Sequence, residues 1–201
     1  MSHIVGIDEA GRGPLAGPVA VGIVVIPSNP STALRTRKFF KGIKDSKQLT
    51  HEERELWYSL ALEAKKKGEL DFHASLVSER VIDRHGISYA LRLGIKRCLE
   101  KLGVNPTSQI FLDGALKAPI QFKHQLTVIR GDEKIPIISL ASVVAKVTRD
   151  RRMVRLAKKF PEFSFEINKG YGTRLHLSAL EKYGRTVIHR QSFLKNLTVA
   201  R

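Results

Sequence analysis

Two adjacent carboxylates near the start of the chain are of the type that phosphate chemistry requires. Asp8 and Glu9 follow a short apolar segment, and a glycine-rich turn containing Arg12 comes directly after them. Carboxylate oxygens are the ligands that Mg²⁺ and Mn²⁺ prefer, and an arginine can pair with a phosphate. Gly11 and Gly13, on either side of the arginine, allow the backbone to approach a ligand closely. This segment therefore indicates metal-assisted chemistry on a phosphate group.

Two later aspartates could join the same site. Asp113 ends the apolar segment 110–112, and Asp150 lies among arginines in a helical pattern. Alone, each has an ordinary explanation: a turn for Asp113 and a solvated, salt-bridged helix face for Asp150. Ser142, Lys146 and Asp150 are four residues apart, which predicts one helical stripe carrying a hydroxyl, an ammonium and a carboxylate. Because two-metal phosphoryl transfer needs several converging carboxylates, we interpret all four acids as candidate ligands.

The other potential ligands have a simpler interpretation. Asp45, Asp132 and Glu133 lie in loop patterns beside lysine or glycine, and we interpret them as structural. The seven histidines show no paired ligand spacing, so we do not expect a zinc site. Cys98 has no partner for an intrachain disulfide, and its helical context predicts a small core residue.

The elements that must position these residues alternate between strands and helices. Strands are predicted at residues 4–8, 19–26, 71–77, 109–112 and 126–129, and helices at 50–67, 78–85, 88–102, 137–160 and 175–183. The first two strands should pair as a hairpin around the glycine-rich turn. The interleaved order predicts an α/β layer architecture.

Composition indicates the kind of partner and the size of the fold. Lysine and arginine total 35 against 19 aspartate and glutamate, so the net charge of +16 favours a polyanion. Composition alone would equally fit a ribosomal protein or a transcription factor. With 201 residues, 42% of them hydrophobic, we expect a single domain over residues 1–201, with about 161–201 as a helical extension packed on it. The chain has neither a leader pattern nor an apolar run of about 20 residues, so we expect a cytoplasmic protein without a membrane segment.

The acidic pair and the Gly11-Arg12-Gly13 turn resemble the signature of the bacterial ribonuclease HII family, the type 2 ribonucleases H. Further blocks similar to the family occur in order at residues 45–47, 111–114, 141–150, 169–173 and 188–193. The resemblance implies the ribonuclease H-like fold, a mixed five-stranded sheet flanked by helices, with a C-terminal helical extension. It also implies that Asp8, Glu9, Asp113 and Asp150 hold two Mn²⁺ or Mg²⁺ ions.

The same resemblance implies an activity and a set of substrate-binding residues. The family cuts the RNA strand of RNA/DNA hybrids and incises duplex DNA at embedded ribonucleotides, leaving 5′-phosphate and 3′-hydroxyl ends. The substrate-binding residues are then expected to be Gly11, Arg12, Gly13, Lys47, Ser142, Lys146 and Tyr171. The glycine turn would detect the 2′-hydroxyl, and Tyr171 would pack against a sugar, although a tyrosine between glycines can also simply close a turn. Lys169 and Arg190 are further candidates for phosphate contacts, and we expect a monomer.

Three other functions fit part of the pattern. The charge alone would suit a non-catalytic basic nucleic-acid-binding protein, and the acids would suit a DNA resolvase or transposase-like nuclease. A dinucleotide-binding enzyme is disfavoured, because Gly11, Gly13 and Gly17 do not have the spacing of that fingerprint. Cleavage of duplex DNA that contains one ribonucleotide separates these alternatives.

Overall fold

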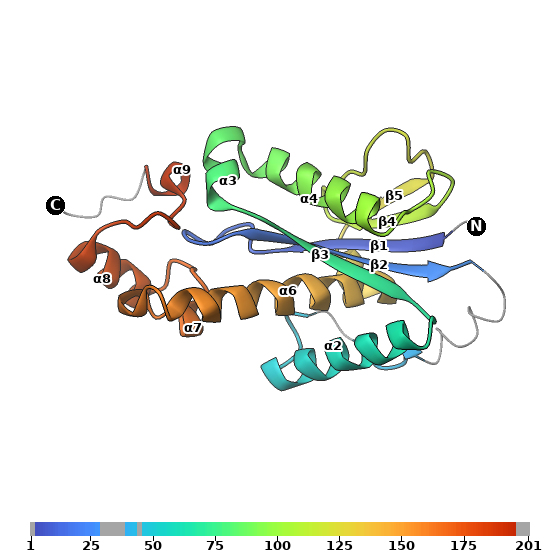
Figure 1. The fold of residues 1–201 in the computed structure, drawn as a ribbon, viewed down its shortest axis with the longest axis horizontal. Coiled ribbons are helices and arrows are strands. Elements are labelled where there is room, and N and C mark those ends of the chain that lie inside the picture. The colour runs from blue at the N-terminus through green and yellow to red at the C-terminus, as the bar shows by residue number, and fades with distance from the viewer. Residues whose placement is uncertain (1–2, 29–38, 44–45, 196–201) are drawn as a thin grey trace.

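A five-stranded mixed sheet forms the centre of the protein, with strand order β3-β2-β1-β4-β5 (Figure 1). The computed structural model describes residues 3–28, 39–43 and 46–195, so Asp45 and residues 196–201 of the expected extension lie outside the described residues. The strands are β1 His3–Ala10, β2 Val19–Pro27, β3 Asp71–Val77, β4 Gln109–Asp113 and β5 Gln125–Val128. The predicted α/β architecture with a mixed five-stranded sheet is confirmed.

The central strand, β1, has an antiparallel neighbour on one side and a parallel neighbour on the other. It pairs with β2 as the predicted hairpin, from His3 opposite Pro27 to Ala10 opposite Ala20. It also pairs in parallel with β4, and β4 pairs in parallel with β5. The carboxyl ends of β1, β4 and β5 therefore lie at the same edge of the sheet, where ligands of α/β proteins commonly bind.

Helices cover both faces of the sheet. The longer helices are α2 His51–Lys66, α3 Glu79–His85, α4 Ile87–Lys101, α6 Pro136–Ala157 and α8 Arg174–Tyr183. The short helical segments are α5 Gly131–Lys134, η1 Pro161–Phe163, α7 Phe165–Asn168 and α9 Gln191–Leu194. Figure 1 shows α3 and α4 above the sheet, with α6 below it and α2 beyond α6. The long helix expected to reach residue 160 ends at Ala157, and the chain then turns into η1 at Pro161, whose ring cannot continue an α-helix.

Two glycines of the sheet leave room for the backbone of the helix α6. A Cβ atom at Gly6 would lie 2.5 Å from the Ile137 carbonyl oxygen, and one at Gly22 would lie 2.2 Å from that of Ala141. Side chains at these positions would push the helix outward. The two glycines thus allow α6 to place its polar residues directly against β1.

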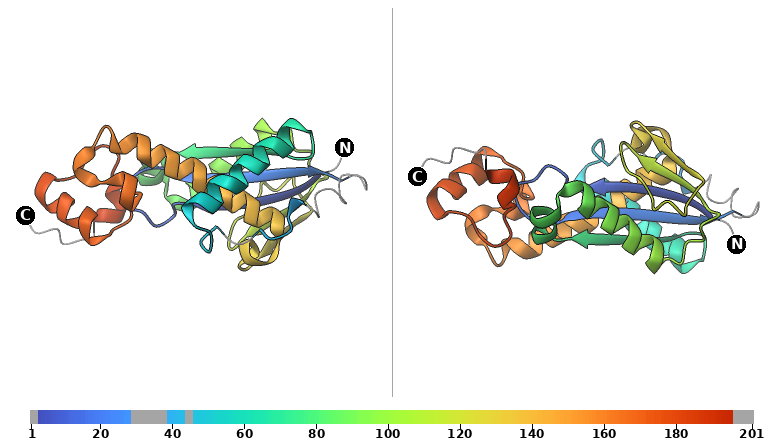
Figure 2. Two further views of the ribbon diagram at one scale, coloured as in Figure 1. Left: turned by 90° about the horizontal axis from the view of Figure 1, so that it is seen from below. Right: turned by 90° about the horizontal axis from the view of Figure 1, so that it is seen from above.

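The C-terminal helices gather at one end of the sheet (Figure 2). Apolar residues of α8 and α9 form one cluster with Ala16, with Met153 near the end of α6 and with Phe165 of α7. Backbone hydrogen bonds join the same region to the glycine-rich turn: the Leu15 amide donates to Gly170, and the Arg190 amide donates to Leu15, both at 2.8 Å. The C-terminal segments therefore help to shape the turn between β1 and β2.

Two further expectations concern burial. Cys98 is fully buried in the cluster between the sheet and α4, as predicted, and burial raises the pKa of its thiol to about 12. None of the helices formed by the described residues combines the length and the apolar character needed to cross a bilayer.

Candidate metal centre and nucleic-acid interface

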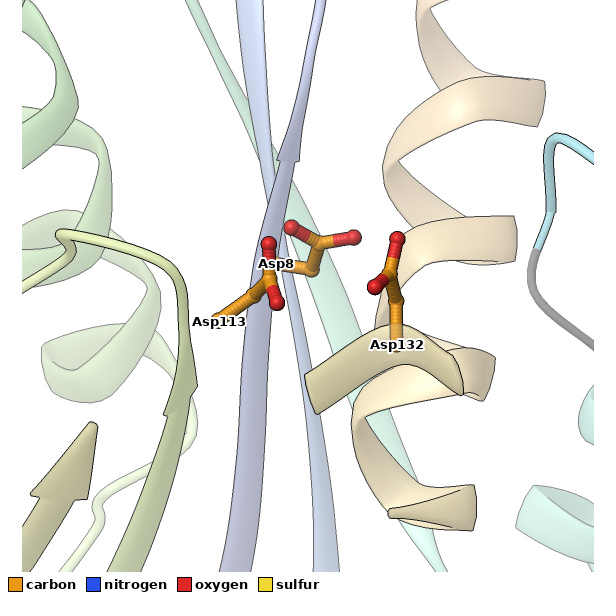
Figure 3. Close-up of side chains that lie close together, drawn as sticks. All are labelled: Asp8, Asp113 and Asp132. Carbon is orange, nitrogen blue, oxygen red and sulfur yellow. The ribbon is translucent and has the colours of Figure 1, made fainter. Parts of the chain in front are cut away.

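Three aspartates meet where β4 ends beside β1 (Figure 3). Asp8, Asp113 and Asp132 each offer one carboxylate oxygen, and these oxygens all lie within 4.8 Å of one another. Ile7 of β1 is paired with Leu112 of β4, so the following residues, Asp8 and Asp113, emerge at the same level of the sheet. Asp132 reaches them from α5. Such a group of oxygens has the composition of a Mg²⁺ or Mn²⁺ site.

Glu9 borders the same group from the next position of β1, and its carboxylate interacts with those of Asp8 and Asp113. The pairing of β1 with β2 continues without a bulge through Glu9 to Ala10, so Asp8 and Glu9 alternate in direction. The pairing of β1 with β4, however, stops at Ile7. Both carboxylates therefore border the space beside Asp113, whose charge acts on each of them. We call Asp8, Glu9, Asp113 and Asp132 the acidic group.

The electrostatics of the acidic group fit the binding of a divalent cation. Burial and then the charge of Glu9 raise the pKa of Asp8 well above its usual value, against a lowering by the Ser142 hydroxyl. Burial also raises the pKa of Glu9, against a lowering by Arg12. The Glu9 Oε2 atom is buried without a hydrogen-bond partner among the described residues. A divalent cation would satisfy this oxygen and relieve the repulsion between the carboxylates.

Asp132 was missed as a candidate by the sequence interpretation, which treats it as structural. Its side chain is only 2% exposed and lies 2.8 Å from the Lys47 ammonium. The neighbouring Gly131 amide donates to Asp113 Oδ1 at 2.7 Å, and the Ser139 hydroxyl donates to the Asp132 carbonyl at 2.6 Å. These bonds hold α5 against the end of β4. The available signal was the Gly131-Asp132 dipeptide just before the long helix, but a helix of four residues has no readable periodicity.

Asp150 does not belong to the acidic group. Its Oδ1 atom accepts a hydrogen bond from Lys146 Nζ at 2.9 Å. It lies eight residues beyond Ser142, which is about 12 Å along a helix. The predicted stripe is thus divided, because Ser142 contacts Asp8 whereas Lys146 and Asp150 contact each other. The structure gives Asp132 the place that the sequence pattern assigns to Asp150.

Ser142 supports the acidic group from behind. It is 3% exposed and forms hydrogen bonds with Asp8 and, at 2.7 Å, with the Ser46 hydroxyl. Because a hydroxyl carries a single proton, donation from Ser142 to the Asp8 carboxylate leaves Ser46 as the donor to Ser142. A side chain so buried cannot reach a nucleic acid, so its expected substrate contact is corrected to a role in holding Asp8.

The glycine turn lies next to the acidic group. Arg12 is half-exposed, and its Nη1 atom lies 3.5 Å from Glu9 Oε1. Gly11 has a φ of +86°, and a Cβ atom there would lie 1.9 Å from Nε of Arg149. Gly13 faces open space. Gly11 is therefore required by the fold, whereas Gly13 leaves room outside the turn for a ligand.

Tyr171 is exposed beside the turn. Its ring lies against the Arg149 guanidinium, 5.7 Å from ring centre to carbon, and 42% of the residue remains exposed. Its backbone carbonyl lies 2.9 Å from Nδ1 of His176, whose Nε2 lies 3.0 Å from Nε2 of His189. The backbone of Tyr171 is thus fixed while its ring is accessible.

The two further phosphate candidates behave differently. Arg190 has no exposed surface, so it cannot reach a phosphate, and that expectation is corrected. Lys169 is half-buried, and its ammonium donates to the carbonyl of Glu166. Lys47, by contrast, keeps 76% of its side chain exposed while paired with Asp132.

Comparisons with known proteins identify the family. The model of the family described as Ribonuclease HII matches residues 5–196. Ribonuclease HII of Caldicellulosiruptor bescii is 40% identical over 96% of this chain and 87% of its own length. The solved ribonuclease H2 of Pyrococcus horikoshii OT3 is 30% identical, covers 94% of this chain and 93% of its own, and superposes with a TM-score of 0.66. A structure of Bst-RNase HIII in complex with Mn²⁺ is 14% identical, with a TM-score of 0.67 over 96% of this chain and 64% of its own, and shows the same fold.

Proposed function

The chain belongs to the ribonuclease HII family and is therefore a ribonuclease H, and from this premise we propose its substrates and its cofactor. It hydrolyses the RNA strand of RNA/DNA hybrids and incises duplex DNA at embedded ribonucleotides. The products carry 5′-phosphate and 3′-hydroxyl ends. Two divalent cations, Mn²⁺ or Mg²⁺, are required.

The observation that carries this proposal is the acidic group. Its carboxylates come from β1, β4 and α5, are largely buried, and leave one Glu9 oxygen without a partner among the described residues. In the proposal, Asp8, Glu9 and Asp113 hold the cations together with Asp132, and Ser142 keeps the Asp8 carboxylate oriented. Bound cations of this kind neutralise charge on a phosphate and lower the pKa of a coordinated water.

The exposed residues around the acidic group would hold the nucleic acid. Arg12 and Lys47 present cationic groups beside the carboxylates, where phosphates of the cleaved strand would lie. The outer side of the turn at Gly13 is open, so its backbone can approach a ribose. The exposed ring of Tyr171 can pack against the sugar at the junction of RNA and DNA. The net charge of +16 favours a polyanion over the whole surface.

The proposed catalytic unit is a monomer that includes the C-terminal segments. All four acids belong to one chain. Residues 170 and 190 are hydrogen-bonded to the glycine turn, so the segment that follows α6 contributes to the same site.

The deciding experiment uses duplex DNA that contains a single ribonucleotide. With Mg²⁺ or Mn²⁺ we expect one incision beside the ribonucleotide, and none with EDTA. The all-deoxy duplex of the same sequence is the control. Treatment of the products with ligase and phosphatase identifies their ends. Equal cutting of both duplexes would favour a DNA resolvase, and binding without cutting would favour a non-catalytic protein, so either result would overturn the proposal.

A further inference from the structure

Arg190 is buried directly behind the glycine turn. It has no exposed surface, and its guanidinium donates to three backbone carbonyls of the turn. Its Nη2 donates to Gly11 at 2.7 Å, its Nη1 to Arg12 at 2.9 Å and its Nε to Gly17 at 2.9 Å. One planar side chain therefore fixes both ends of the turn.

Arg149 supports the same turn from α6. It is also fully buried, and it donates to the carbonyls of Pro18, at 2.9 Å, and Ala16, at 3.3 Å. The face of its guanidinium lies against the ring of Tyr171. The Arg149 side chain packs so closely against residue 11 that only a glycine fits there. We call Arg149 and Arg190 the arginine pair.

The arginine pair forms its hydrogen bonds with backbone oxygens and not with carboxylates. Within the described part of the chain, neither arginine has a carboxylate within ion-pair distance. A buried guanidinium is costly unless hydrogen bonds replace its water. Five carbonyls of residues 11–18 make most of this replacement, and only Nη1 of Arg149 lacks a partner among the described residues. The inward direction of these carbonyls is therefore strongly fixed.

The inward carbonyls determine what the turn presents to the outside. In a trans peptide the C=O and the N–H of one unit point in opposite directions. The Gly11 carbonyl shares its peptide unit with the Arg12 amide, and the Arg12 carbonyl shares its unit with the Gly13 amide. Both amides must therefore point away from Arg190, toward the exposed side, and neither donates to a backbone carbonyl within the described residues. Two oriented donors result.

We infer that Arg149 and Arg190 are positioning residues, which hold the Arg12 and Gly13 amides and the Tyr171 ring in one fixed arrangement for reading a ribose. This inference rests on the proposed function for the identity of the ligand. The arginine pair itself contacts no substrate, because it is buried. A lysine at either position keeps the charge but is a flexible point donor, and it cannot bridge several carbonyls.

The first test does not depend on activity. We would measure amide hydrogen exchange of the peptide covering residues 11–18 in the parent, Arg190→Lys, Arg149→Lys and the control Arg152→Lys, which changes an exposed arginine on the same helix. We expect about tenfold faster exchange in this peptide for Arg190→Lys, a smaller increase for Arg149→Lys, and none for the control. Unchanged exchange in both buried variants would overturn the inference.

The second test measures sugar discrimination. In Ca²⁺, used to retain binding, we would compare the affinity for duplex DNA with one ribonucleotide to that for the all-deoxy duplex. Arg190→Lys should lower this ratio about tenfold while leaving all-deoxy binding and the control unchanged. A parent protein without discrimination would refute the proposed function. A discriminating parent with an equally discriminating Arg190→Lys would refute only the inference.

Folding of the variants is monitored by circular dichroism and thermal unfolding. If Arg190→Lys does not fold, Arg149→Lys decides, because it retains the three Arg190 bonds. If neither variant folds, the arginine pair maintains the fold as a whole, and the inference is overturned.

Discussion

The acidic group and the arginine pair both contact the glycine turn, the first through Glu9 and Arg12 and the second through backbone carbonyls, but they treat buried charge differently. In the acidic group, like charges are buried together, and one oxygen has no hydrogen-bond partner among the described residues. In the arginine pair, like charges are also buried together, yet five backbone carbonyls accept their hydrogen bonds. Each region keeps one buried atom without a hydrogen-bond partner among the described residues, Glu9 Oε2 in the acidic group and Nη1 in Arg149. The arginines, however, donate five hydrogen bonds to backbone carbonyls.

This difference indicates that the acidic group binds a ligand, whereas the arginine pair supports the backbone. In the acidic group, burial and then the charges of neighbouring carboxylates raise the pKa values of Asp8 and Glu9, and a bound cation would offset both effects. The backbone of residues 11–18, by contrast, is held by permanent hydrogen bonds from the arginine pair. Repelling buried carboxylates therefore mark the proposed reaction centre, and buried guanidiniums hydrogen-bonded to the backbone mark the structure that supports it.

The largest effect should come from removing one charge of the acidic group. Asp113→Asn keeps the size of the side chain but removes a proposed ligand, so we expect a loss of cleavage of about 1000-fold or more. Hybrid binding should persist. Single-turnover cleavage and a binding assay measure the two properties, with Asp71→Asn, an exposed residue at the start of β3, as control. Cleavage by Asp113→Asn at the parent rate would contradict the metal assignment.

The next comparison decides between two aspartates. Asp132→Asn should reduce cleavage about 100-fold, because Asp132 lies in the acidic group. Asp150→Asn should reduce it less than about tenfold, because Asp150 pairs with Lys146. The same cleavage assay on both variants measures this order. A reversed order would return the ligand role to Asp150 and remove Asp132.

A smaller effect is expected from changing Tyr171, the proposed sugar contact. Tyr171→Ala should reduce cutting at a single ribonucleotide about tenfold, which corresponds to the loss of one ring packed on a sugar. Affinity for all-deoxy duplex should change little. Tyr171→Phe, which keeps the ring, is the matched control and should retain most activity. Equal losses in cutting and in general binding would remove the sugar-reading role.

The smallest effect concerns stability and pH. Because the pKa values of Asp8 and Glu9 are raised in the folded protein, the folded state holds protons more tightly than the unfolded state. The metal-free protein should therefore lose stability as pH rises from about 4 through the raised values. The melting temperature measured in EDTA should show this decline. At neutral pH, added Mn²⁺ should raise the melting temperature by about 2–4 °C for each kcal/mol of binding free energy. A melting temperature that ignores both pH and Mn²⁺ would contradict the electrostatic account.

The sequence predicts much of the fold because its elements carry their own signals. The hairpin of β1 and β2 follows from two β-branched runs around a glycine turn, and the long helix follows from its apolar pattern and Pro161. The strand order does not follow, because pairing of β1 with β4 joins segments about a hundred residues apart. Local periodicity contains no information on such contacts.

The acidic group could be predicted only in part, because its members are also brought together by contacts distant in sequence. Asp8 and Asp113 end up together because their strands are neighbours, and Asp132 joins them through a four-residue helix held by tertiary hydrogen bonds. Spacing correctly groups Lys146 with Asp150, but it does not tell which helix face meets the sheet. That face is set by close packing at Gly22 and Gly11, which turns residues 141, 145 and 149 inward. The buried role of Arg190 likewise depends on three carbonyls that are distant in sequence.

The most direct test is anomalous diffraction from crystals of the protein soaked in Mn²⁺. The account predicts anomalous density bounded by the carboxylates of Asp8, Asp113 and Asp132, with Glu9 Oε2 turned toward it. An acidic group without such density, or manganese bound instead at Asp150, would contradict the central claim that these four acids form the metal centre.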